Sequence, residues 1–338
     1  MTTVLKFPSI NQFRQTIKSV RDYAKYNNTP LSVLRFTGTI KLHGTNAAVR
    51  YNAITDELVC QSRERIITAF DDNAGFARFV HDNQIAFKRA MEPFTSEDAP
   101  EVILFGEWAG KGVKNTVAVG ELEKAFYVFD GGFVQYDVDA NPTFERMDWE
   151  IVFNIVRKVF PSNVYSIFDF PSFVMDIDFN RPELSQNELV QITIDVETQC
   201  PVAKSFGVDG IGEGVVWYHA DSGLRFKVKG EKHSTTKVKT IKAIAAVDLE
   251  RLASVAEFVD SVVTDNRLNQ GIDKLGEMGL FVDITSMGPF LKWVAGDVLK
   301  EEMDLILESC IDKKELMHAI STKAKAFFMF KLNDLETV

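Results

Sequence analysis

The spacing of apolar residues changes along the chain, and it first indicates a helix near the N-terminus. One helical face is shared by Phe13, Ile17, Val20 and Ala24. This spacing is typical of an amphipathic helix with one buried face. Ser9 and Gln12 fit a capping box at the start of the segment. We therefore predict a helix that begins after Ser9.

Strand-like patterns follow and extend to about residue 230. Apolar and β-branched runs bounded by turn residues predict strands. They cover residues 31–60, with turns at 43–46 and 52–56, and then 102–105, 126–129, 214–218 and 224–228. Between Asp71 and Met91 the pattern predicts a helix. From Asp148 to Cys200 it is mixed and assigns no element.

After about residue 243 the apolar spacing is helical, and strand signals nearly vanish. The helical sets are Leu252, Val255, Val259 and Val262; Leu291, Val294 and Val298; and Leu316, Ile320, Ala324 and Phe327. The whole pattern predicts an α+β fold. An α+β domain over residues 1–243 is followed by a small all-α domain over residues 244–338.

Composition agrees with two globular domains and indicates no membrane segment. The chain has 338 residues, of which 46% are hydrophobic and 25% charged. No run approaches the roughly 20 apolar residues of a membrane helix, and residues 1–7 lack the pattern of a secretory signal. Cys60, Cys200 and Cys310 have no metal-binding or redox spacing. We expect reduced thiols in a cytoplasmic protein.

Charge is uneven along the chain. The net charge of −10 argues against a protein that coats nucleic acid in general. From Arg225 to Lys242, however, seven Lys or Arg residues accompany one acid, Glu231. A basic stripe on an acidic protein can bind phosphate. The alternative for such a run is a solvated surface.

Lys41 is the first residue whose surroundings indicate chemistry. It leaves a predicted strand and enters the tight polar turn Leu42-His43-Gly44-Thr45-Asn46. A lysine is a nucleophile only when deprotonated, and its reference pKa is about 10.4. Cationic neighbours favour the neutral form, and Lys227 and Lys229 alternate on one face of a strand. Alone, Lys41 would also fit a surface hairpin.

The run from Lys41 to Asn46 resembles the nucleophile motif of the RNA ligase 2 family. This family includes phage double-strand-sealing and kinetoplastid RNA-editing ligases. With DNA ligases and capping enzymes it forms the covalent nucleotidyltransferase superfamily. Further superfamily motifs follow in order over residues 41–229, and Asn266–Gly279 resembles the family's C-terminal domain. The resemblance implies an ATP-grasp-like antiparallel-sheet domain, and it is weakest in residues 1–30 and 135–205.

The resemblance also implies roles for the nucleotide site. Lys41 forms the covalent lysyl-AMP. Arg63, in Cys60-Gln-Ser-Arg63, contacts the nucleotide sugar and the RNA phosphate. Glu107, in Phe105-Gly-Glu-Trp-Ala-Gly110, accepts a hydrogen bond from the AMP ribose. Phe129 stacks on the adenine.

The remaining motifs concern the phosphates. Glu213, in Ile211-Gly-Glu-Gly-Val-Val216, would hold a divalent cation. Lys227 and Lys229 would face the α-phosphate. Ile40 and Asn46 would border the nucleotide. His43 would orient the turn or contact the end being joined, and a structural hydrogen bond is the alternative.

Three positions depart from the family pattern. Ile40 stands where members usually carry an acid that reads the adenine amino group. Ser62 and Tyr218 stand where lysines are common. These departures bear on selectivity for ATP and on efficiency.

The sequence therefore predicts an ATP-dependent RNA ligase that joins 3′-hydroxyl and 5′-phosphate ends through lysyl-AMP. We expect Mg²⁺, with Mn²⁺ as an alternative, as the metal. The expected partners are RNA ends, with nicked duplex favoured. Predicted RNA contacts are Arg63, Lys232, Lys237 and Lys239. A phage origin fits the resemblance and would place the protein in a host cytoplasm.

Two alternatives remain open. DNA ligases and capping enzymes usually follow the fifth motif with an all-β barrel. The helical pattern after residue 243 and His43, where DNA ligases have aspartate, argue against them. The second is a non-catalytic binder of RNA ends or nucleotide. Against it stand the intact Lys41, Glu107, Glu213, Lys227 and Lys229. For the RNA substrate, the alternative to a nicked duplex is single-stranded RNA.

Overall fold

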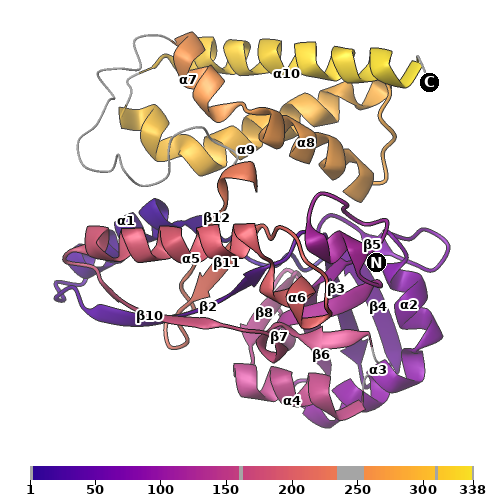
Figure 1. The fold of residues 1–338 in the computed structure, drawn as a ribbon. Helices are drawn as coiled ribbons and strands as arrows, with labels where there is room; N and C mark the ends of the chain where they lie inside the picture. The colour runs from indigo at the N-terminus through magenta and orange to yellow at the C-terminus, as the bar shows by residue number, and fades with distance from the viewer. Residues whose placement is uncertain (1–2, 160–162, 234–254, 309–310, 337–338) are drawn as a thin grey trace. The chain divides into compact units, whose positions relative to one another are not determined.

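In the computed structural model, the strands form two β-sheets, and all of them lie before residue 230 (Figure 1). The structure describes residues 3–159, 163–233, 255–308 and 311–336. The larger sheet has the order β5-β4-β3-β6-β7-β8 with β9 beside β7, and the smaller has the order β1-β12-β11-β2-β10. The strands are β1 Asn11–Gln12, β2 Val33–Lys41, β3 Thr45–Asn52, β4 Glu57–Ser62, β5 Ile66–Ile67, β6 Glu101–Ala109, β7 Ala125–Tyr136, β8 Pro142–Arg146, β9 Val164–Ser166, β10 Phe173–Asp178, β11 Gly214–Tyr218 and β12 Arg225–Lys229.

Helices lie between the strands and make up the C-terminal part. They are α1 Phe13–Tyr26, α2 Phe76–Asp82, α3 Gln84–Met91, α4 Trp149–Val159, α5 Gln186–Thr198, α6 Pro201–Ser205, α7 Val255–Val262, α8 Asp265–Glu277, α9 Met287–Glu308 and α10 Lys313–Glu336. None of these described helices is both long and apolar enough to cross a membrane. The mixed sheets and helical C-terminal part confirm the predicted α+β class.

The chain forms two compact units, each described by itself below. Unit 1 comprises Met1–Ser9, Thr37–Val174 and Ile194–Val216. Unit 2 comprises Ile10–Phe36, Met175–Thr193 and Trp217–Val338. The predicted domain boundary at residue 243 lies outside the described residues.

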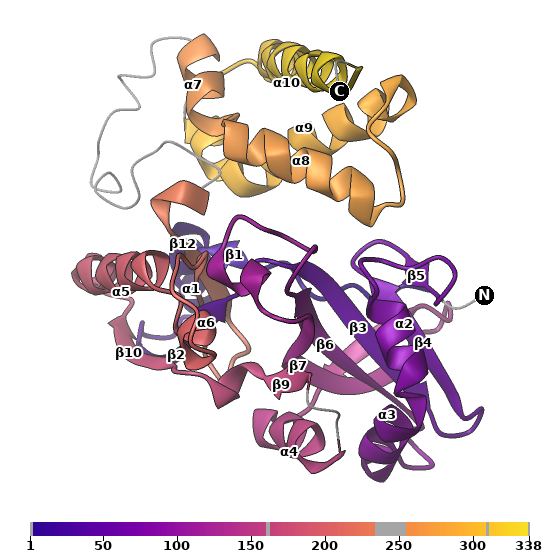
Figure 2. The ribbon, with the colours of Figure 1, turned by 45° about the vertical axis from the view of Figure 1, so that its right-hand side comes forward.

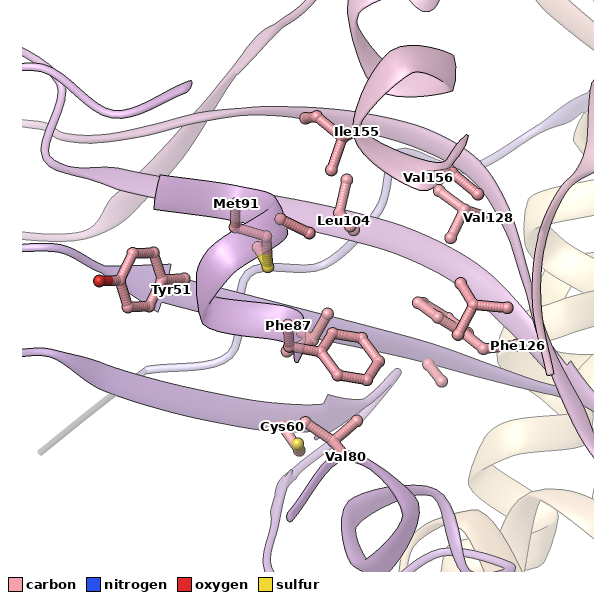
Figure 3. Packing of buried hydrophobic residues seen from close by; sticks show 14 of the residues in the cluster. Tyr51, Cys60, Val80, Phe87, Met91, Leu104, Phe126, Val128, Ile155 and Val156 are labelled. Atoms are coloured by element: carbon pink, nitrogen blue, oxygen red, sulfur yellow. The ribbon is translucent and has the colours of Figure 1, made fainter. Parts of the chain in front are cut away.

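The core of unit 1 lies between one face of the larger sheet and helices α2, α3 and α4. Because side chains alternate across a strand, every second residue of β3, β6 and β7 points to these helices. Figure 3 shows Phe87 and Met91 of α3 over the sheet, with Leu104 and Val128 beneath α3 and α4. Phe87 and Met91 are fully buried. Burial of such side chains stabilises a fold by roughly 1.5–3 kcal/mol each.

The opposite face of this sheet carries polar and aromatic residues of three motifs. Asn46 pairs with Glu107 across β3 and β6, and Glu107 pairs with Tyr127 across β6 and β7. Their chain neighbours Ala47, Trp108 and Phe126 belong to the helix-covered core. Strand alternation therefore turns Asn46 and Glu107 away from the helices.

The N-terminal helix confirms the predicted apolar face but not its predicted start. Phe13, Ile17 and Ala24 are buried. The helix begins at Phe13, where the Gln12 amide donates to Gln15 Oε1 at 2.9 Å. The Ser9–Gln12 capping box was therefore wrong. Residues 11–12 pair with β12 as strand β1, so their extended backbone delays the helix.

The sequence pattern was less accurate in two middle segments. The single helix predicted from Asp71 to Met91 is two helices, α2 and α3, divided at Asn83. The Asn83 amide side chain donates to the Phe79 carbonyl at 2.8 Å, which closes α2. Between 148 and 200, where no element was assigned, the chain forms α4, β9, β10 and α5.

The C-terminal helices α7 to α10 enclose a core of their own within unit 2. Its buried residues include many of the predicted positions, among them Val259, Val262, Val294, Val298, Leu316, Ile320 and Ala324. Helical spacing therefore located this core correctly. Leu252, which was assigned to the same pattern, lies outside the described residues.

Candidate active site

The turn after Lys41 is held against strand β6 of unit 1. Strand β2 ends at Lys41 and β3 begins at Thr45. The Gly44 amide donates to Glu107 Oε1 at 2.9 Å. A Cβ on Gly44 would lie 2.3 Å from the Trp108 carbonyl oxygen, so only glycine fits this close approach. Glu107, which the family resemblance places at the ribose, thus also fixes the backbone of the turn after Lys41.

Glu213 contacts two side chains of this turn. Lys41 Nζ lies 2.6 Å from Glu213 Oε2. His43 Nδ1 lies 3.3 Å from the same oxygen. Glu213 is 3% exposed, and its backbone comes just before β11. One buried carboxylate oxygen therefore contacts both side chains of the turn.

The surroundings of Glu213 fit a hydrated divalent cation. Among the described residues no group of three or more His, Cys, Asp or Glu side chains could hold a metal. Mg²⁺ does not need such a cage, because it keeps several waters and binds through one or two carboxylates. One buried carboxylate beside the turn after Lys41 is therefore enough for such a cation, and the role of Glu213 stays a prediction.

Phe129 lies on the same strand face as Tyr127 and Glu107, and a residue from the N-terminus packs against it. The Phe7 ring is 5.0 Å from the Phe129 ring and 5.1 Å from the Phe105 ring, measured between centroids. Phe7 is 4% exposed. Sequence reasoning assigned no role to Phe7, because a single apolar residue outside a periodic pattern carries no local signal.

Arg63 occupies the tight turn between β4 and β5. Its side chain is half-buried and has no hydrogen bond or ion pair with another described residue. Ser62, where family members often carry lysine, builds this turn. Its hydroxyl accepts from the amides of Glu64 and Arg65 at 3.3 and 3.2 Å. The guanidinium is thus presented on a firm backbone and keeps its donors available for an anion.

The two other departures also have packing partners. Ile40 is 2% exposed and packs as a core residue with an aliphatic side chain. In unit 2, the Tyr218 hydroxyl donates to the Ala220 carbonyl at 3.1 Å. The Arg225 guanidinium lies 4.9 Å from the centre of the Tyr218 ring.

Lys227 and Lys229 lie on strand β12 in unit 2, alternating with the buried Phe226 and Val228. Lys227 Nζ lies 2.6 Å from Glu301 Oε1 of helix α9. No sequence motif had indicated this partner. The spacing of Lys227 and Lys229 by two residues did place both on one strand face, as predicted.

Glu301 belongs to a buried charge cluster on α8 and α9. Arg267 is fully buried and pairs with Asp297, Glu301 and Glu302 at 2.9, 3.0 and 3.2 Å. Burial alone would raise the pKa of Glu301, but Lys227, Lys229 and Arg267 outweigh it and hold that pKa well below its usual range. Burial would likewise lower the pKa of Arg267, yet its three carboxylates raise it.

The predicted RNA contacts of the basic stripe are only partly within the described residues. Lys232 lies in a short turn, where its backbone carbonyl accepts from the Asn266 side chain at 2.8 Å. Lys237 and Lys239 lie outside the described residues.

Comparison with known proteins gives one family. The RNA ligase family model matches residues 34–235, which is more than half of the chain. No curated protein matches significantly. Among solved structures, a lysine-to-methionine mutant of the Naegleria gruberi RNA ligase with AMP and Mn is 16% identical, with a TM-score of 0.45. A lysine-to-alanine mutant of the same ligase, with ATP and Mn, is also 16% identical, with a TM-score of 0.46. Each match covers 69% of this chain and 58% of that ligase.

Proposed function

The chain belongs to the RNA ligase family, and on this basis we propose that it is an ATP-dependent RNA ligase acting through lysyl-AMP on Lys41. One observation carries the proposal most directly. Three motifs far apart in the sequence meet in unit 1, where Lys41 contacts Glu213 and the turn after it is bound to Glu107. A structural lysine at a hairpin would not need this convergence of a buried carboxylate and a fixed turn.

The proposed reaction has three phosphoryl-type transfers. The Lys41 amine attacks the α-phosphorus of ATP, and the bond to pyrophosphate breaks. A 5′-phosphate oxygen of the RNA then attacks the lysyl-AMP, which frees Lys41 and leaves a 5′–5′ pyrophosphate. Finally the 3′-hydroxyl attacks the 5′-phosphate, and AMP leaves. Such transfers depend mainly on positioning and charge neutralisation.

The chain would position the nucleotide by its base, sugar and phosphates. Phe129 would stack on the adenine, a contact worth roughly 1–3 kcal/mol. Glu107 would accept from the ribose, and Arg63 would reach the sugar and the RNA phosphate. Asn46, beside Glu107 on the same sheet face, would line this space.

The phosphates require positive charge and a neutral nucleophile. Lys227 and Lys229 would neutralise the α-phosphate and favour loss of the Lys41 proton. Glu213 would hold Mg²⁺ or Mn²⁺, which when bound neutralises charge on phosphate oxygens. Lys41 Nζ lies 2.6 Å from Glu213 Oε2, so this ion pair must open before the amine attacks.

His43 has two possible duties within this scheme. Its 3.3 Å contact with Glu213 favours a role in holding that carboxylate. Sealing assays on nicked duplex and on single-stranded RNA with His43→Ala would also show whether it acts on the RNA end. Loss of sealing with normal lysyl-AMP formation would place it there.

The decisive experiment replaces Lys41 by arginine. Arginine keeps the positive charge that pairs with Glu213, but a guanidinium does not act as a nucleophile at neutral pH. Wild type, Lys41→Arg and the control Lys111→Arg are incubated with α-³²P-labelled ATP and Mg²⁺, or with labelled GTP, and resolved on a denaturing gel. Lys111 is an exposed lysine of unit 1 paired with Glu123.

We expect an acid-labile, base-stable label on wild type and Lys111→Arg and none on Lys41→Arg. Preference for ATP over GTP would show that base selection survives the buried Ile40. Pretreatment with pyrophosphate removes any AMP already bound. If the treated wild type stays unlabelled, the ligase proposal fails, and a non-catalytic binder of nucleotide or RNA ends takes its place.

A further inference from the structure

The loop over residues 68–75 presents an aromatic ring to solvent. Phe70 is 97% exposed, although it is a large apolar side chain. Single exposed apolar residues are common on proteins and need no explanation by themselves. What distinguishes Phe70 is the structure of the loop that holds it.

Hydrogen bonds, and not burial of Phe70, fold this loop. The Thr68 and Asp71 backbones pair at 3.0 and 3.2 Å. The Thr68 hydroxyl accepts from the amides of Phe70 and Asp71 at 3.3 and 3.1 Å. The Asp72 carboxylate accepts from the amides of Ala77 and Arg78, both at 2.8 Å, at the start of α2. Phe70 therefore stands on a defined backbone.

The same loop is tied to the proposed nucleophile motif. The Asn73 side chain donates to the Thr45 hydroxyl at 2.8 Å. The Trp108 indole donates to the Ala74 carbonyl at 3.0 Å. Asn73 is three positions after Phe70, so their Cα atoms are at most about 11 Å apart. In both Figures 1 and 2, β5 and α2, which flank this loop, lie beside β4.

Cations accompany the ring. The Arg78 guanidinium lies 6.0 Å from the centre of the Phe70 ring. Arg65 donates to the Asp72 carbonyl at 3.0 Å and pairs with the Asp71 carboxylate at 2.6 Å, so that acid is neutralised. Arg63, four residues before β5 ends, has no hydrogen bond or ion pair among the described residues.

An exposed ring with guanidinium groups matches the chemistry of a nucleotide. Every base has a face that stacks on an aromatic ring, and its phosphate pairs with arginine. A protein partner fits less well, because the neighbouring loop residues Thr68, Asp71, Asp72 and Asn73 are polar or charged and a single ring offers little apolar area.

We propose that Phe70 stacks on a base of the RNA strand beside the ends being joined. This inference rests on the proposed ligase function. It adds a base contact to the phosphate contact of Arg63. Because stacking does not read base edges, the contact would serve ends of any sequence.

The test uses the full chain and a nicked RNA duplex with 2-aminopurine at each position flanking the nick in turn. Binding and 2-aminopurine fluorescence are measured for wild type, Phe70→Ala, Phe70→Tyr and Phe281→Ala. Phe281 is a matched control, since it is 86% exposed in the other unit. Formation of lysyl-AMP from ATP alone reports whether each variant is folded.

We expect wild type, Phe70→Tyr and Phe281→Ala to quench the probe at one flanking position. Phe70→Ala should lose this quenching and bind about tenfold more weakly, with an unchanged salt slope because no phosphate contact is lost. Equal quenching and affinity for Phe70→Ala and wild type would overturn the inference, as would a wild type that binds no RNA. A wild type that binds RNA with this quenching but forms no lysyl-AMP would overturn the ligase proposal alone.

Discussion

Glu213 is the carboxylate that contacts the motif around Lys41 in unit 1. It is almost fully buried and contacts both Lys41 and His43. A carboxylate at this depth is costly unless it is paired. Glu213 is paired here with Lys41, the proposed nucleophile, and with His43. The same oxygen that holds Lys41 in the free protein would therefore serve the metal during the reaction.

Glu213→Gln tests this dual role, because it keeps the size of the side chain and removes its charge. We expect the rate of lysyl-AMP formation to fall on the order of 100-fold, the scale of losing one preorganised electrostatic contact. Quench-flow with labelled ATP measures it. The control Glu123→Gln breaks a similar ion pair, Lys111–Glu123 at 2.9 Å, on the exposed surface, and should change the rate little. Equal rates for Glu213→Gln and wild type would remove Glu213 from the site.

At the scale of elements, strand β12 and helix α9 share charges within unit 2. Lys227 of β12 forms an ion pair with Glu301 of α9, and Glu301 also forms an ion pair with Arg267 of α8. The Gln12 side chain, just before α1, donates to Glu301 at 3.3 Å. A single carboxylate thus links a proposed phosphate-binding lysine to three other elements. We therefore expect the charge of Glu301 to affect the free energy of unfolding of unit 2.

The pH dependence of stability follows from the pKa of Glu301. That pKa is held below the ordinary 4.5 in the folded chain. The stabilisation is therefore present above pH 4.5 and is lost as pH falls toward the folded-state pKa. We expect Glu301→Gln to lower the free energy of unfolding at pH 7 by about 3 kcal/mol, the scale of breaking a buried ion pair.

Urea unfolding of wild type and Glu301→Gln from pH 7 to pH 3 would show the difference narrowing below pH 4.5. Burial and Glu301 raise the pKa of Asp297 in wild type, and only burial still raises it in Glu301→Gln. Asp260→Asn is the control, since Asp260 forms an exposed pair with Lys323 at 2.7 Å. A Glu301→Gln effect as small as that of Asp260→Asn would show that the charge cluster contributes little.

For the whole molecule, the distribution of charge matters more than its sum. The chain carries −10 overall, yet residues 225–242 are strongly basic. RNA is a polyanion, and its binding depends on the local density of cations. We therefore propose the stripe as an RNA-binding segment, in addition to Arg63.

Reversing two charges in the stripe tests this proposal. Lys237→Glu with Lys239→Glu should weaken sealing of nicked RNA and reduce its salt dependence by about one to two units of slope, while lysyl-AMP still forms. The control reverses Lys18 and Lys25, which are exposed on α1 and change the net charge equally. Sealing rates at several salt concentrations decide between them. Equal losses for both pairs would mean that net charge alone matters.

Features that depend on neighbouring residues along the chain could be predicted from the sequence alone. The apolar spacing of Val294 and Val298 predicted a helical core, because one face of a helix repeats every three or four residues. Gly44 marked a tight turn after Lys41, and the motif it belongs to identified the family. Alternation placed Lys227 and Lys229 together on one strand face.

Contacts between residues far apart in the sequence depend on the tertiary structure. Lys41 and Glu213 are 172 positions apart, and strand order brings them to 2.6 Å. Phe7 against Phe129, and Glu301 against Lys227, depend on how elements pack and not on local propensity. The predicted capping box at Ser9 and Gln12 was wrong for the same reason, because pairing of β1 with β12 keeps residues 11–12 extended. Periodicity and turn chemistry act over a few residues, whereas register and packing act across the whole fold.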